Sequence, residues 1–408
     1  MGKFIQKQGS FIFFRNQLLQ ISFIILILCL TLTSYAEQSQ IVTGADQPDL
    51  YLPKLKGKNL ALVVNQTSRI GDQHLVDYLL EKKLTIKRIF APEHGFRGEA
   101  GAGELIDNSK DKDTGIPIIS VYGKNRKPSV AQLSGIDVVI FDIQDVGCRF
   151  YTYISTLHYM MEACAENNVT LLILDRPNPN GDYFDGPILQ PAFKSFVGMD
   201  PIPVVHGCTI GELAQMINGE KWLAKGLKVK LEIIKVANYT HSMKYEPPVK
   251  PSPNLPNYLS IRLYPSLCLF EATSVSVGRG TQFPFQVLGF PDQTFGNFTF
   301  TPQSLKGMEL NPLQKDKKCF GEDFRELNEA PHFTLSYFID WFHKFKNKDE
   351  FLTRSQWFNQ LMGNEKVLKL ILEGKGEAEI RKSWETELVN YGAIRQKYLL
   401  YTDFNSTK

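Results

Sequence analysis

The amino-acid sequence predicts an α/β protein, built from a Rossmann-like doubly wound parallel sheet followed by a smaller α+β domain. In the first half, short and continuously apolar segments alternate with helical segments, a pattern typical of a parallel sheet covered on both faces. A proline-rich stretch separates this half from a second half of different character. Polar residues directly follow several of the apolar segments, and ligands bind an open parallel sheet at that end of its strands.

Five apolar segments are the expected strands of the sheet. They cover residues 58–64, 84–90, 116–122, 137–143 and 169–174. Helices are predicted over residues 74–83, where apolar residues follow helical spacing, and over residues 152–167. Residues 209–212 match a capping box, which predicts the start of a further helix.

The domain boundary is predicted at residues 246–256, where five of eleven residues are proline. Proline lacks a backbone N–H and fixes φ, so neither a helix nor a central strand is expected there. The first domain is therefore expected over residues 37–248, as the catalytic domain, and the second over 257–408, completing the cleft. Expected elements of the second domain are an aromatic and β-branched stretch at 258–290 and amphipathic helices at 332–346 and 378–390.

The first 36 residues have the order of a secretory signal peptide. Residues 1–17 are basic and polar, residues 18–32 form a short apolar run, and Ser34 and Ala36 are small residues at the two positions that a signal peptidase reads. The alternative is an uncleaved membrane anchor, but a spanning helix needs about 20 apolar residues and this run is shorter. We therefore expect an exported protein, periplasmic or secreted, with no stable membrane span after cleavage.

The charge balance changes when this segment is removed. The whole chain has 46 Lys and Arg against 43 Asp and Glu, and the first 36 residues hold Lys3, Lys7 and Arg15 with no acidic residue. The mature chain would carry 43 groups of each sign. A near-neutral chain argues against nucleic-acid binding, which needs a basic patch to neutralise phosphates.

The mature chain keeps an odd number of cysteines, and none of them forms a CxxC pair. Such spacing supports neither a structural zinc site nor a dense disulfide framework. We expect most of these cysteines to be buried apolar residues.

Polar residues that follow the predicted strands are candidates for a site, because the carboxyl ends of parallel strands meet at one edge of the sheet. After the first and second strands come Asn65 and then Glu93, His94 and Arg97. At the ends of the fourth and fifth strands come Asp142, Gln144 and Asp145, and then Asp175, Arg176 and Asn178.

Glu93 is the strongest single candidate for catalysis. It lies between a proline and a histidine in a loop with flanking glycines. Burial there would raise the pKa of its carboxyl and keep it protonated for general-acid work. The alternative is a loop carboxylate paired with Arg97. His94 either orients Glu93 or contacts substrate, or it has a structural role in the loop.

Asp142, Asp145 and Asp175 are candidates for a base, for sugar-hydroxyl binding or for a metal ligand. Aspartates at strand ends also commonly hydrogen-bond loop amides. Arg149, Arg176 and Arg279 offer planar guanidinium groups that suit a carboxylate, although each is also a natural partner for a nearby aspartate.

Three further candidates lie outside these loops. Tyr151 either stacks on a sugar ring or fills the core. Glu271 and Arg279 belong to a polar stretch amid apolar sequence, which either faces the first domain across a cleft or forms a simple hairpin turn.

Several familiar motifs are missing from the sequence. There is no Walker A pattern, no HExxH and no GxSxG, and the glycine-rich residues 98–103 lack the order of a dinucleotide fingerprint. We therefore predict no cofactor and no metal site.

Eight ordered strings cover the chain from about Gly57 to Tyr401: VVNQTS, FAPEHGFRGE, VVIFDIQDVGCRFYTY, LDRPNPNG, DGP, PVVHGCTIGELA, EATSVSVGRGT and a final SW…RQKYLLY pattern. Together they resemble the exo-β-N-acetylmuramidase NamZ family. The resemblance implies an exported glycosidase that removes N-acetylmuramic acid from the non-reducing ends of peptidoglycan fragments, in cell wall turnover or recycling. It also implies a site between a Rossmann-like domain and a smaller one.

The resemblance also implies a role for one residue, because the glutamate of the EHGF motif is the family's proposed catalytic acid and corresponds to Glu93. The second catalytic group stays open between Asp142, Asp145, Glu104 and the substrate's own acetamido group, and with it the stereochemical outcome. Since muramic acid carries a lactyl carboxylate, we hypothesise that Arg149 or Arg176 pairs with it.

Two other functions are compatible with the sequence. One is a non-catalytic muropeptide-binding protein. The other is a metal-dependent hydrolase that uses Asp142, Asp145, Asp175 and His94. The expected partners are peptidoglycan-derived disaccharides or glycan ends, and the oligomeric state stays open.

Overall fold

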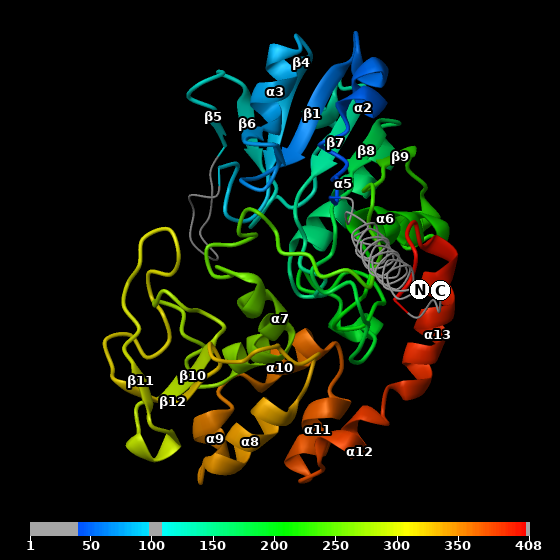
Figure 1. Cartoon of the computed structure of the whole chain (residues 1–408). Helices are drawn as coiled ribbons and strands as arrows, with labels where there is room; N and C mark the ends of the chain where they lie inside the picture. Colours follow the sequence, from blue (N-terminus) through cyan, green and yellow to red (C-terminus); the bar gives the residue numbers. More distant parts are fainter. Residues whose placement is uncertain (1–39, 98–107, 405–408) are drawn as a thin grey trace, which may run out of the picture. The chain divides into compact units, whose positions relative to one another are not determined.

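The structure is a computed structural model that describes residues 40–97 and 108–404 (Figure 1). The described residues from Val42 onward form one compact unit. The predicted signal peptide, the glycine-rich residues 98–103 and Glu104 lie outside the described residues. The predicted domain limits of 248 and 257 stay a prediction.

A seven-stranded sheet organises the first half of the chain, and its order is β5-β6-β4-β1-β7-β8-β9. All neighbouring strands are parallel except β5 and β6. The strands are β1 (Asn59–Val64), β4 (Thr85–Ala91), β5 (Ser109–Lys110), β6 (Pro117–Ser120), β7 (Val138–Asp142), β8 (Thr170–Leu174) and β9 (Leu231–Ile234), and a separate small hairpin contains β2 (Arg69–Ile70) and β3 (Gln73–His74).

The chain builds this sheet outward from β1 in two directions. After β1 it adds β4 and β6 on one side, and then returns to add β7, β8 and β9 on the other. The predicted doubly wound sheet is therefore confirmed, and the strand order reverses between β1 and β7.

All five predicted strands are present, as β1, β4, β6, β7 and β8. The sequence did not reveal β9. This four-residue strand lies at the sheet edge, and the charged Glu232 interrupts its apolar residues. The helices of this half are α2 (Pro48–Leu55), α3 (Leu75–Glu81), α4 (Val130–Leu133), α5 (Tyr153–Glu166) and α6 (Ile210–Gly219). The predicted capping box opens α6, where Thr209 and Glu212 exchange side-chain and backbone hydrogen bonds.

Alternate residues of the strands face two apolar clusters, as the two-residue period of a strand requires. In β1, Leu60 and Leu62 face a cluster that contains α2 and α3. Ala61 and Val63 face the other cluster, which contains α5 and α6 and continues into the helices of the second half. One continuous core therefore joins the two halves of the chain.

The second half is α+β, as predicted. Its antiparallel sheet has the order β10-β12-β11, with β10 (Val287–Phe290), β11 (Phe298–Phe300) and β12 (Cys319–Asp323). Its helices, olive to red in Figure 1, are α7 (Tyr258–Leu267), α8 (Ser336–Lys344), α9 (Lys348–Phe351), α10 (Ser355–Met362), α11 (Lys366–Leu372), α12 (Glu377–Arg381) and α13 (Glu385–Arg395).

The prediction of one helix over residues 378–390 is wrong. The structure has two helices there, α12 and α13, with a break between them. At the break Trp384 turns into the interior, where it is buried and its indole N–H donates a hydrogen bond to Asp185 at 3.3 Å. Burial of this ring explains the break, which the amphipathic pattern alone does not show.

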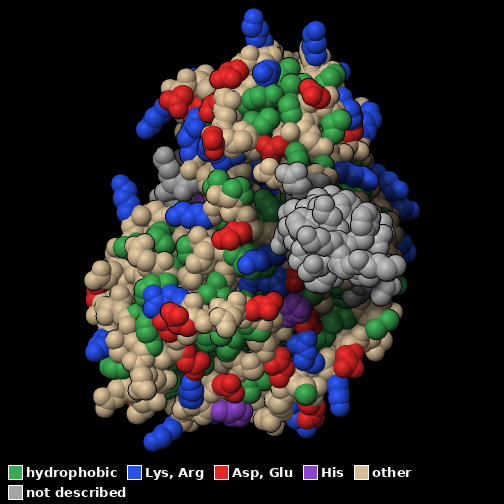
Figure 2. Space-filling model, in the orientation of Figure 1, with side chains coloured by type: hydrophobic (Ala, Val, Ile, Leu, Met, Phe, Trp, Pro, Cys, Tyr) green, Lys and Arg blue, Asp and Glu red, His purple; other side chains and the backbone are tan. Residues whose placement is uncertain are grey.

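The surface and the cysteines agree with the composition. Figure 2 shows Lys and Arg side chains interspersed with Asp and Glu side chains over the visible face. The five cysteines after residue 36 are all buried and free of disulfides, as expected. Within the described ranges, no helix has the length and apolar character needed to span a bilayer.

Arg149 connects distant parts of the fold. Its guanidinium is fully buried, and burial lowers the pKa to about 10. Nη1 donates hydrogen bonds to the main-chain oxygens of Pro187 and Ile202, both at 2.7 Å, and Nη2 donates to that of Leu361 at 2.9 Å. Three carbonyl groups from two halves of the chain thus depend on one side chain.

We predict that Arg149→Lys lowers the free energy of unfolding by about 2–4 kcal/mol. A lysine ammonium cannot match the geometry of a guanidinium fork, so buried acceptors lose their donors. Chemical denaturation measures the change, with the surface substitution Arg325→Lys as the matched control. A loss no larger than that of the control would contradict this role.

Asp175 directly follows β8 and is fully buried. Its carboxylate accepts hydrogen bonds from Thr209 Oγ1 at 2.7 Å, from Gly211 N at 2.8 Å and from Tyr401 Oη at 2.6 Å. It therefore joins the sheet to the start of α6 and to the C-terminal segment. Burial raises the pKa of Asp175 to about 6, against the opposing effect of the three donors.

This raised pKa predicts a specific pH dependence. A carboxyl whose pKa is higher in the folded state than its usual 3.8 favours folding at low pH, and this contribution is lost as the pH rises to about 6. Unfolding free energies of the wild type and Asp175→Asn, measured in urea from pH 4 to 7, should therefore converge or cross with rising pH. The expected change in their difference is on the order of 3 kcal/mol. A constant difference would refute the shift.

Candidate functional site

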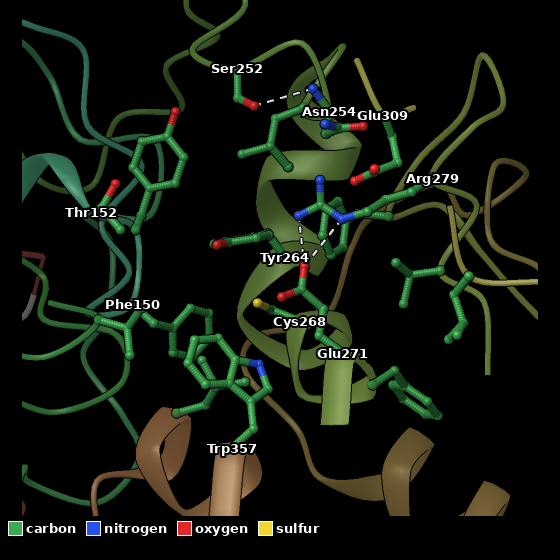
Figure 3. A pocket seen from close by; sticks show the side chains of 18 of the residues that line it. Phe150, Thr152, Ser252, Asn254, Tyr264, Cys268, Glu271, Arg279, Glu309 and Trp357 are labelled. Atoms are coloured by element: carbon green, nitrogen blue, oxygen red, sulfur yellow. Dashed lines mark hydrogen bonds and ion pairs between the residues drawn. The ribbon is translucent and has the colours of Figure 1, made fainter. Parts of the chain in front are cut away.

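A cavity of about 510 Å³ is lined by residues from both halves of the chain (Figure 3). The sheet side contributes residues from the loops after β4 and β6 and from the segment before α5: Glu93, His94, Tyr122, Phe150, Tyr151 and Thr152. The proline-rich segment contributes Ser252 and Asn254. The second half contributes polar and aromatic residues that include Tyr264, Glu271, Arg279, Glu309, Arg354 and Trp357.

The loop after β4 turns Glu93 into this cavity. His94 and Gly95 follow with positive φ angles of 69° and 79°, so the chain makes a left-handed turn directly after Glu93. Thr152, at the N-terminal end of α5, donates a hydrogen bond from Oγ1 to Glu93 Oε2 at 2.7 Å. His94 is buried, and its Nε2 lies 3.3 Å from Ser252 Oγ.

Three tyrosines surround Glu93. Burial raises the pKa of Tyr122, and the charge of Glu93 and a hydrogen bond to it raise it further. Tyr122 therefore stays a protonated donor beside the carboxylate. Tyr151 and Tyr153 donate from their hydroxyls to the main-chain oxygen of Pro251, at 2.9 and 3.3 Å, and so hold the proline-rich segment over the sheet edge.

Asp142 and Arg176 form a buried ion pair behind this cavity. Arg176 donates from Nε and Nη2 to the two carboxylate oxygens of Asp142, at 2.5 and 3.0 Å, and also from Nη2 to the main-chain oxygen of Arg69. Neither residue lines the cavity that contains Glu93. Arg176 instead lines a smaller one of about 290 Å³, together with Gln144.

The other polar residues at the sheet edge hold loops in place. Asn65 Oδ1 accepts hydrogen bonds from the backbone and hydroxyl of Thr67, at 2.9 and 2.6 Å. Gln144 donates to the main-chain oxygens of Asp145 and Pro177, both at 2.8 Å. Asn178 donates to the main-chain oxygen of Cys208 at 2.9 Å.

Asp145 and Arg97 also lie outside the lining of the cavity. Asp145 Oδ2 accepts from Gly147 N at 2.7 Å and lies 3.4 Å from His206 Nε2. Arg97 lies among three aspartates and pairs most closely with Asp111, at 3.3 Å. The predicted residues do meet at one edge, but among those on the sheet side only Glu93, His94 and Tyr151 line the cavity.

Glu271 and Arg279 meet on the opposite wall, as Figure 3 shows. Arg279 donates to Glu271 Oε1 from Nε at 3.1 Å and from Nη2 at 2.6 Å. Burial opposes the charge of Arg279, but Glu271 more than offsets this, so the pKa of Arg279 is raised. The sequence suggested either a stretch that faces the cleft or a hairpin turn. Both descriptions apply, because Gly278 and Gly280 form a turn with positive φ and this turn places Arg279 at the cavity.

Several lining residues had no signal in the sequence. The position of Thr152 directly after Tyr151 is its one signal in the sequence, whereas Glu309, Arg354 and Trp357 lie in segments without a recognisable motif. Glu309 belongs to the long connection between β11 and β12, and Arg354 and Trp357 belong to the start of α10. Only the tertiary fold brings them to Glu93.

Across residues 40–97 and 108–404, no three His, Cys, Asp or Glu side chains come together in a group suited to a metal ion. The Asp142 carboxylate pairs with Arg176, and that of Asp175 accepts three hydrogen bonds.

Two family models together match most of the chain. The N-terminal model of exo-β-N-acetylmuramidase NamZ matches residues 60–259, and the C-terminal model matches residues 262–401. A relative from Bacillus subtilis (strain 168), peptidoglycan β-N-acetylmuramidase NamZ, is 37% identical over 390 residues. The match covers 90% of this chain and 92% of the relative.

Two crystal structures of DUF1343 family proteins from Bacteroides fragilis NCTC 9343 have the same fold. One has a TM-score of 0.83 and 46% identity, and covers 90% of this chain and 100% of its own. The other has a TM-score of 0.77 and 27% identity, and covers 89% and 99%. From the family models and the Bacillus relative, we conclude that the chain belongs to the exo-β-N-acetylmuramidase NamZ family.

Proposed function

We propose that this protein is an exo-acting glycoside hydrolase that releases N-acetylmuramic acid from the non-reducing ends of peptidoglycan fragments. Membership of the family and the name of the Bacillus relative support this activity. The observation that carries the proposal is the position of Glu93. Its carboxyl group lies at the carboxyl edge of the sheet and faces the cavity, and the second half of the chain forms the opposite wall.

In this proposal Glu93 is the general acid. Glycoside hydrolysis needs a proton on the leaving oxygen and stabilisation of an oxocarbenium-like transition state. Glu93 supplies the proton, and hydrogen bonds from Thr152 and Tyr122 stabilise the carboxylate that remains. Because both donors come from elements fixed by the sheet, the carboxyl is held in place before the substrate binds.

The second carboxyl group is best sought on the opposite wall. In the described part of the chain, the carboxylates that line this cavity besides Glu93 are Glu271 and Glu309. Asp142 and Asp145 lie in the network behind it. A carboxylate on that wall would give inversion if it activates water as a base, and retention if it acts as nucleophile. The acetamido group of the substrate is the alternative nucleophile and would also give retention.

We predict that Glu93→Gln lowers kcat on a muramic-acid disaccharide by about 10²–10⁴-fold, the usual contribution of a general acid. The loss should be much smaller on a muraminide with an activated leaving group, since such a group leaves with little protonation. Product release measured by chromatography compares the two substrates. An equal loss on both would exclude the acid role.

The matched control for this experiment is Glu166→Gln. Glu166 forms a surface ion pair with Lys127 at 2.7 Å, outside the cavity, so its substitution should leave both activities unchanged. Thermal unfolding of both variants shows whether the fold is retained.

The same assay separates the two alternative functions. A muropeptide-binding protein would bind the disaccharide without turnover in the wild type. A metal-dependent hydrolase would lose activity in EDTA and regain it with added metal, whereas a carboxylate glycosidase is indifferent to chelation.

We also propose that the protein is exported and that its signal peptide is removed after Ala36. The support is the order of basic, apolar and small residues in the first 36 positions. Expression of the full chain in a bacterial host, with fractionation and N-terminal sequencing, should give an exported protein that begins at Glu37. A cytoplasmic or membrane-bound protein that keeps residues 1–36 would contradict the proposal.

A further inference from the structure

We infer that Arg354 and Trp357, at the start of α10, bind the lactyl carboxylate of the muramic acid residue. This inference rests on the proposed function and names the residues that select its substrate. N-Acetylmuramic acid differs from N-acetylglucosamine by the lactyl ether, which adds one negative charge. A site that prefers the charged sugar therefore needs a cation that is not already neutralised.

Two arginines line the cavity, and they differ in their partners. Arg279 has two of its three guanidinium nitrogens on Glu271, and the third, Nη1, is enclosed without a partner in the described part of the chain. A ligand carboxylate would have to approach Arg279 through the enclosed Nη1, where Glu271 already balances the charge of the guanidinium. Arg279 is thus suited to hold Glu271 in position.

Arg354 has no such partner. Its guanidinium makes one long hydrogen bond, from Nη1 to the main-chain oxygen of Glu271 at 3.4 Å. Considering residues 40–97 and 108–404, no carboxylate lies within ion-pair distance of Arg354, and its side chain is exposed. An incoming anion would gain a charge-assisted pair there without breaking one.

Trp357 completes the arrangement. The guanidinium carbon of Arg354 lies 5.1 Å from the centre of the Trp357 ring, a cation–π distance that keeps the arginine over the indole. The indole N–H is buried and has no acceptor among the residues described. Because an indole nitrogen only donates, a ligand oxygen would satisfy it. Figure 3 shows Trp357 beside Phe150, on the side of the cavity away from Ser252.

Glu93 and Arg354 line the same cavity and would act on different groups of one sugar. Glu93 comes from the sheet edge and Arg354 from α10 in the second half. The scissile bond is at C1 of the sugar and the lactyl ether is at C3, so one ring can present both groups at once. Arg149 and Arg176, the arginines first considered for this role, have their guanidinium groups engaged by main-chain oxygens and by Asp142, and neither lines the cavity.

The test compares three chromogenic β-glycosides: N-acetylmuraminide, its lactyl methyl ester, and N-acetylglucosaminide. Arg354→Gln should lower kcat/KM for the muraminide by about 10–100-fold, mostly through KM, because the charge interaction is equal in ground and transition states. The ester and the glucosaminide, which lack the charge, should change little. Trp357→Phe keeps the ring but removes the donor, and should weaken the muraminide alone by a smaller factor.

Arg354→Lys keeps the charge and should restore part of the preference. Arg325→Gln, on the surface and paired with Asp323, is the matched control and should leave all three substrates unchanged. An equal loss on charged and neutral substrates in Arg354→Gln would mean a structural role and would overturn the inference. An unchanged preference for the muraminide would overturn it as well.

A binding measurement keeps this test separate from the fate of the proposed function. Calorimetry compares the affinities of N-acetylmuramic acid and N-acetylglucosamine for the wild type and for Arg354→Gln. If the wild type binds the acid more tightly without hydrolysing any glycoside, the proposed activity fails while the inference stands. If the wild type hydrolyses the muraminide but Arg354→Gln loses affinity equally for both sugars, the inference fails while the proposed activity stands.

Discussion

The need to satisfy buried polar groups at the carboxyl edge of the sheet determines most of this site. The sheet places several carboxylates, amides and guanidinium groups where water is excluded, and each unpaired group there is costly. Asp142 is paired with Arg176, and Asp175 accepts hydrogen bonds from Thr209 and Tyr401. These side chains hold the loops at that edge, and Glu93 itself is held by the hydrogen bond from Thr152.

The second half of the chain contributes in a different way. A continuous apolar cluster runs from α5 and α6 into α7 and α8, so the two halves share one core. The Tyr151 and Tyr153 hydroxyls then fasten the proline-rich connection at Pro251. Since the core and these hydrogen bonds act together, the walls of the cavity are positioned by the same packing that stabilises the fold.

Much of the fold was accessible from the sequence, because apolar runs, helical spacing and a capping box are local patterns. The five strands and the start of α6 followed from them. The break between α12 and α13 did not, since it depends on the burial of Trp384 against Asp185, a residue far away in the sequence. The edge of the sheet that holds Glu93 was predictable for the same local reasons.

The choice among polar residues was not predictable, because it depends on distant partners. Nothing near Arg149 in the sequence indicates that Leu361 accepts its hydrogen bond, and nothing near Asp175 indicates Tyr401. The sequence also does not show whether the charge of an arginine is paired, because the pairing depends on the fold. An arginine with a resident carboxylate, such as Arg279 with Glu271, contributes chiefly to structure, whereas Arg354 without one retains its attraction for an anion. A chain whose basic and acidic residues nearly balance, 46 against 43, can therefore select an anionic sugar, since selection depends on which cations the fold leaves unpaired.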